Sequence, residues 1–137
     1  MIPGCFWTRR ASIQAALHPA PNPAPGDPIC QDPSVPNPDE CYYLYYVLGN
    51  EDGSHVFVAQ RKTLTALEFK MTSAEARDAV AKDPSLIARV TPAMFVMFGA
   101  IPITERGQII GAIGYSGGDD VNCATAGWKV IQSRLSQ

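Results

Sequence analysis

This chain has little charge and no long run of charge of one sign. Its 137 residues contain 11 lysines and arginines and 13 aspartates and glutamates, which gives a formal net charge of −2. Basic residues are adjacent only at Arg9-Arg10 and Arg61-Lys62. Because contacts to phosphates need a basic stripe, we do not expect nucleic acid as a partner.

Long apolar runs and targeting segments are also missing. No apolar run approaches 18 residues, so no membrane span is predicted. The first ten residues lack the basic-then-apolar order of a signal peptide. The expectation is therefore a cytoplasmic protein if Met1 is the natural start.

The cysteines lack the spacing of a zinc site. Four are present, at Cys5, Cys30, Cys41 and Cys123, without a CxxC or Cys/His pattern. An even count permits disulfides, and a Cys30–Cys41 bridge or a bridge from Cys5 competes with free thiols. Paired cysteines would require an oxidising, extracytoplasmic compartment.

Proline is concentrated in one stretch. Eight prolines lie between residues 19 and 38, which excludes a helix or a central strand there. We expect an extended arm that serves as a linker, wraps a neighbouring subunit or covers a ligand. Residues 9–18 before it are predicted to form a short amphipathic helix, so the chain divides into residues 1–40 and a domain over residues 41–137.

The sequence of residues 41–137 predicts pairs of strands separated by helices. The expected elements are strands at 41–48, 55–59, 94–98 and 108–115, a kink at 99–102 and a hairpin over 103–108. Helices are expected at 61–70, 73–82 and 119–136, the second of them opened by a capping box at residues 72–75, with a short turn over 83–89. Because strands come in hairpin pairs, this order predicts an α+β fold with an antiparallel sheet flanked by helices.

The most informative local feature is the run from Gly111 to Asp120, which reads as a buried strand, a glycine turn and a helix start. Asp119 or Asp120 can cap that helix. Backbone N–H groups at such a junction can hold an anion or a polar ligand edge. The alternative, which the local pattern favours, is a tight strand-to-helix connection and nothing more. The spacing is not GxGxxG, so no dinucleotide site is predicted.

Three stretches together resemble the GlcG/HbpS family, also called the haem-degrading domain. They are the helix Ala59–Ser73, the segment Gly99–Ile103, and the sequence GAIGYSGG at 111–118 followed by CATAG at 123–127. Tyr115 stands where the family usually has valine, and the proline arm replaces its direct helix-to-strand connection. The resemblance implies a sheet flanked by helices, assembly into oligomers and, in some members, binding of haem or a corrinoid.

Site residues follow from the turn and from the histidines. Lys62, if its helix packs near the turn, would supply a cation beside Ser116, Gly117, Gly118 and Asp119, which we predict to bind a ligand. His18 and His55 are candidate axial ligands of a haem, or else a helix-terminal and a turn residue.

Three functions stay open on this sequence. The first is an oligomeric module that binds a small molecule, with haem or a related tetrapyrrole as the ligand. The second is an enzyme that acts on a small carboxylate or hydroxy acid, with Lys62 and His55 as acid–base groups. The third is a structural subunit of a larger protein complex, in which the proline arm and the tyrosine-rich strand at 41–48 pack on another protein.

Overall fold

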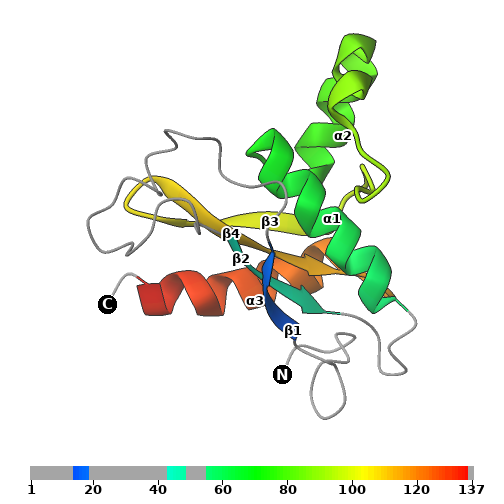
Figure 1. Cartoon of the computed structure of the whole chain (residues 1–137). Helices are drawn as coiled ribbons and strands as arrows, with labels where there is room; N and C mark the ends of the chain where they lie inside the picture. The colour runs from blue at the N-terminus through cyan, green and yellow to red at the C-terminus, as the bar shows by residue number, and fades with distance from the viewer. Residues whose placement is uncertain (1–13, 19–42, 49–54, 136–137) are drawn as a thin grey trace.

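The protein is an α+β fold in which a four-stranded sheet lies between helices (Figure 1). The computed structural model describes residues 14–18, 43–48 and 55–135. Its elements are, in chain order, β1 (Gln14–His18), β2 (Tyr43–Leu48), α1 (Val56–Phe69), α2 (Ser73–Lys82), the 3-10 helix η3 (Pro84–Arg89), β3 (Ala100–Glu105), β4 (Gln108–Tyr115) and α3 (Asp120–Leu135). The predicted fold class is confirmed.

The strand order is β1-β2-β4-β3, with antiparallel pairing at both edges. The predicted hairpin over 103–108 is confirmed, because it joins β3 to β4. The expected kink at 99–102 is wrong, because β3 already begins at Ala100, which pairs with Gly114. The central pair differs from the expectation, because β2 and β4 run parallel, with Leu44 opposite Gly111 and Leu48 opposite Tyr115. Parallel neighbours need a crossover connection, and the helices α1 and α2 lie in the chain between them.

The helix predicted over residues 9–18 is wrong for its described part. Gln14–His18 forms the edge strand β1 and pairs with β2, so that His18 lies opposite Tyr43. A helix of so few residues is marginal by itself, and backbone pairing with an open strand edge overrides the weak helical pattern. Residues 9–13 and the proline-rich stretch lie outside the described residues.

The strand predicted over residues 55–59 is also wrong. Its β-branched and aromatic residues suggested a strand, but α1 begins at Val56 and continues to Phe69. The partner of β2 is therefore β1 and not this segment. Ala59 explains the outcome, because it is fully buried on the helix face where β4 approaches α1 at Gly114. Tertiary packing thus overrides the strand propensity of the segment.

The third expected strand, Met94–Phe98, is an irregular segment instead. Its apolar residues serve different purposes: Met94 is buried beside α1, whereas Phe95 and Phe98 keep more than a third of their surface exposed. The backbone N–H of Phe95 donates to the carbonyl of Arg61, so the segment is held by α1 rather than by a sheet.

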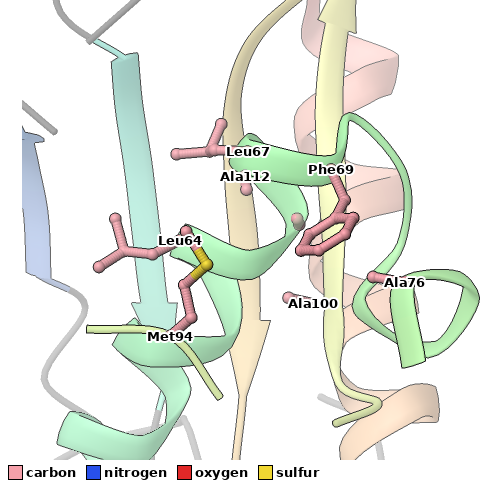
Figure 2. Close-up of a cluster of buried hydrophobic side chains, with 8 residues drawn as sticks. Leu64, Leu67, Phe69, Ala76, Met94, Ala100 and Ala112 are labelled. Atoms are coloured by element: carbon pink, nitrogen blue, oxygen red, sulfur yellow. The ribbon is translucent and has the colours of Figure 1, made fainter. Parts of the chain in front are cut away.

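Two apolar cores lie on the two faces of the sheet. One lies under α1 and α2, and Figure 2 shows it: Leu64, Leu67, Phe69, Ala76, Met94, Ala100 and Ala112. The other joins the sheet to α3 through Ile103, Ile113, Tyr115, Cys123 and Ala124. Successive residues of a strand point to opposite faces, so Ala112 and Ile113 enter different cores. Both faces of β4 are therefore buried, and its end is fixed from two sides.

The helix ends follow the sequence signals. The Thr72 side chain accepts a hydrogen bond from the N–H of Glu75 and also bonds its carboxylate, which confirms the predicted capping box at α2. The helix predicted over 119–136 is α3, and Trp128 and Ile131 pack on the sheet while Val121 stays exposed. No helix in the described part of the chain is long and apolar enough to cross a bilayer.

Candidate functional site

The glycine turn lies where β4 ends and α3 begins, as predicted. Ser116 follows the last residue of β4 and is only 4% exposed, whereas Gly117, Gly118 and Asp119 are exposed. Gly117 has a φ of 114°, a backbone conformation that favours glycine. The strand therefore ends in a buried serine, and two exposed glycines follow it at the start of a helix.

Lys62 reaches this turn from α1. Its side chain is 2% exposed, and Nζ donates to Asp120 Oδ2 at 2.8 Å and to the carbonyl oxygen of Tyr115 at 3.3 Å. The structure thus brings Lys62 beside the Ser116 turn. Its charge, however, is neutralised by Asp120 within the protein, because a buried ammonium needs a partner.

Asp120 connects this lysine to the turn itself. While Oδ2 accepts from Lys62, the other carboxylate oxygen accepts the backbone N–H of Gly118 at 3.0 Å. The Asp120 carboxylate therefore binds both the Lys62 ammonium and the Gly118 N–H group, which could otherwise have bound an anionic ligand. The neighbouring Asp119 makes a different contact, accepting a hydrogen bond from Asn122 at 2.7 Å. Sequence reasoning named Asp120 only as a possible helix cap.

Gly99, which precedes β3, packs closely against Lys62 and Tyr115. Its φ is +122°, and a Cβ placed on it would lie 2.7 Å from the carbonyl oxygen of Tyr115 and 3.1 Å from Lys62 Nζ. Any side chain would therefore push into the lysine contacts. Only glycine at position 99 leaves room for the contacts of Lys62. The Gly99–Ile103 stretch and the Lys62 helix therefore form one structural unit, although they are far apart in the sequence.

His55 supplies the partner that sequence reasoning did not find for Ser116. It immediately precedes α1, and its Nδ1 lies 3.3 Å from Ser116 Oγ. His55 as a whole residue is exposed. The pair joins residues 61 positions apart. The expected strand at 55–59 concealed this contact, because only a helix beginning at Val56 places His55 at the end of β4.

His18 lies elsewhere. It is opposite Tyr43 at the start of β2, whereas Leu48 at the end of β2 is the residue opposite Tyr115. The backbone of His18 is therefore at the end of the sheet remote from Ser116. Of the two histidines, only His55 lies at the glycine-turn site of its own chain.

Metal and cysteine chemistry add little at this site. Within the described ranges, no three residues of histidine, cysteine, aspartate or glutamate are grouped to hold a metal ion. Cys123 is buried on the side of α3 that faces the sheet and is disulfide-bonded, and its partner lies outside the described residues. The Cys30–Cys41 bridge and the bridge from Cys5 fall on residues that the structure does not describe.

The comparisons with known proteins agree with this architecture. Residues 50–129, more than half of the chain, match the sequence model of the family described as "Haem degrading protein HbpS-like". The chain belongs to the HbpS-like family. A solved structure titled "Crystal Structure of HbpS" is 27% identical, with a TM-score of 0.51, and the match covers 57% of each chain. No curated protein matches the chain.

The family match contains the whole glycine-turn site. His55, Lys62, Gly99, Ser116 and Asp120 all lie between residues 50 and 129. The proline-rich stretch lies before the matched region. Membership of the HbpS-like family supports a haem-related role in binding a small molecule.

Proposed function

We propose that this protein binds haem or a related tetrapyrrole at the glycine turn, where His55 would hold the iron. Family membership supports the ligand class. The observation that carries the assignment of His55 is its contact with Ser116, because a ligating histidine almost always has its second ring nitrogen held by an oxygen.

The geometry of His55 fits such a ligand. Nδ1 faces Ser116 Oγ at 3.3 Å, so Nε2 is the ring nitrogen that would take the iron. His55 is an exposed residue, so a large planar ligand can approach this position. Ser116 in turn is fixed by the buried end of β4. Bound haem would supply a redox-active iron centre, and the protein's part is to orient the imidazole.

The remaining predicted ligand residues have separate roles in this proposal. Gly117, Gly118 and Asp119 form the exposed rim that a polar edge of the ligand would contact. Lys62 acts indirectly, since its ammonium holds Asp120 and the Tyr115 carbonyl and thereby fixes the turn. This pairing disfavours Lys62 as an acid–base group, and with it the proposal of an enzyme for small carboxylates.

A haemin titration of the full chain tests the proposal. We expect the unmodified protein to give a shifted Soret band, His55→Ala to lose it, and His18→Ala, the matched control, to retain it. Ser116→Ala should weaken binding about tenfold, the scale on which outer-sphere partners of a ligating histidine act. Added imidazole should restore the band in His55→Ala.

Two outcomes would overturn the proposal. One is the absence of any spectral change when haemin is added to the unmodified protein. The other is a Soret band that is the same in His55→Ala as in the unmodified protein. Circular dichroism of each variant shows whether a lost band reflects lost folding.

A further inference from the structure

An exposed patch of aromatic rings and arginines lies along α1, α2 and the segment before β3. It adjoins the glycine-turn site at Phe98, whose ring lies 5.7 Å from Lys62 Nζ. We define the aromatic–arginine patch as Phe57, Arg61, Arg77, Phe95 and Phe98. The three rings are 67%, 37% and 37% exposed, in the order Phe57, Phe95, Phe98. Contiguous exposed apolar side chains on a soluble domain mark an interaction site.

The patch is organised by its cations. The guanidinium of Arg61 lies 5.8 Å from the Phe57 ring and 5.9 Å from the Phe95 ring. Arg77 repeats the arrangement at the other end, 5.6 Å from the Phe98 ring. Arg61 also donates through Nη2 to the carbonyl oxygens of Pro92 and Met94. Backbone contacts thus hold Arg61 and the rings beside it, whereas Arg77 pairs with Asp78, with its Nε 3.6 Å from Asp78 Oδ1.

Surfaces of aromatic rings recognise extended proline-rich segments. Such a segment lies flat against aromatic grooves at low entropic cost, because it is already extended before binding. Positive charge beside the rings selects segments that also carry carboxylates. The chemistry of the patch therefore specifies an acidic, proline-rich partner.

This chain contains such a segment. Residues 19–42 include eight prolines and four acidic residues, with no lysine or arginine. The four acids are Asp27, Asp32, Asp39 and Glu40. The charge of the segment therefore complements Arg61 and Arg77, and its composition matches what the aromatic rings would bind.

The points where this segment joins the sheet favour a second copy of the chain as the partner. Residues 19–42 connect His18 to Tyr43, which lie opposite each other at the start of β2. The patch lies at the other end, since Phe98 precedes Gly99, whose carbonyl accepts the N–H of Tyr115 at the end of β4. Both attachment points of the segment therefore lie at the end of the sheet remote from the patch of the same chain.

We propose that the proline-rich segment 19–40 of one chain docks on the aromatic–arginine patch of a second copy and thereby joins the two subunits. The proposal does not depend on haem binding. It assigns the contact to a segment outside the HbpS-like match, so it is a feature of this chain rather than of the matched region.

The native mass of the full chain provides the first test. We expect an oligomer for the unmodified protein and dissociation for Phe57→Ser and for Arg77→Glu, which change exposed side chains. Val130→Ser is the matched control, because Val130 is 49% exposed on α3, across the sheet from α1. Arg61 is left unchanged, since its hydrogen bonds hold the segment before β3.

A synthetic peptide of residues 19–40, with Cys30→Ser, provides the second test. It should bind Phe57→Ser about tenfold more weakly than the Val130→Ser control, as expected for the loss of one aromatic anchor. Asp27→Asn and Asp32→Asn in the peptide should weaken binding further, and added salt should do the same.

Three outcomes would overturn the proposal. A monomeric unmodified chain excludes docking between copies, and an oligomer that survives Phe57→Ser and Arg77→Glu excludes the patch. If both variants dissociate the oligomer but the peptide binds none of the proteins, the patch contacts the folded body of the second copy and the assigned segment is wrong.

Discussion

Lys62 Nζ lies 2.8 Å from Asp120 Oδ2, and this ion pair joins α1 to α3 at the end of β4. The two helices cover opposite faces of the sheet, so the pair links both cores. It also decides the chemistry of the glycine turn, because the carboxylate that neutralises Lys62 holds the N–H of Gly118.

Lys62→Met should lower the free energy of unfolding by about 3 kcal/mol, since it leaves Asp120 without its buried partner. Urea denaturation measures the loss. Lys129→Met, at an exposed position on the same α3 helix as Asp120, should change stability by less than about 0.5 kcal/mol. Equal effects of the two substitutions would show that the ion pair contributes nothing specific.

Gly99→Ala should be among the most damaging small substitutions. The new Cβ would lie 2.7 Å from the Tyr115 carbonyl oxygen at a φ of +122°, so steric overlap adds to backbone strain. We expect a loss of about 3 kcal/mol. Gly107→Ala separates the two causes, because its φ is +77° with open space around it, and should cost only about 1 kcal/mol. Similar losses in thermal unfolding would argue against the close contact.

Tyr115→Phe should stabilise the protein. The Tyr115 hydroxyl is buried and has no hydrogen-bond partner among the residues that the structure describes. Removing it abolishes the cost of an unsatisfied polar group while the ring keeps its packing. We expect a gain of about 1 kcal/mol in chemical denaturation. A clear loss would reveal a hydrogen bond to the hydroxyl.

Gln132→Ala should loosen the outer strand of the sheet. The Gln132 amide donates to the Thr104 carbonyl at 2.7 Å and accepts the Thr104 N–H at 3.1 Å, beside the irregularity in β3 pairing. We expect a loss of about 1–2 kcal/mol, and hydrogen exchange at the Thr104 amide should accelerate. Unchanged exchange there would mean that α3 protects this strand by other contacts.

Much of the fold follows from local sequence signals. The capping box at Thr72, the hairpin of β3 and β4 and the closing helix α3 have turn and cap residues whose preferences agree with their apolar spacing. The glycine turn was also predictable, since only glycine readily adopts the backbone that Gly117 shows. Each of these elements is determined by neighbours within a few residues.

Tertiary packing decided the segments whose local signals were ambiguous. Residues 55–59 have strand-forming side chains, yet they are helical because Ala59 meets β4 at Gly114, where no side chain fits. Residues 14–18 form a strand because an edge of β2 was available. The contacts of His55 with Ser116 and of Lys62 with Asp120 span about 60 residues, and no local pattern encodes them.

The sequence alone therefore determined the fold class, the glycine turn, the family resemblance and a set of candidate site residues. Only the tertiary structure decided their roles. His55 faces Ser116, His18 lies at the end of the sheet remote from Ser116, and Asp120 neutralises the charge of Lys62. The physical reason is that local backbone preferences depend on adjacent residues, whereas charge pairing and burial depend on which distant elements pack together.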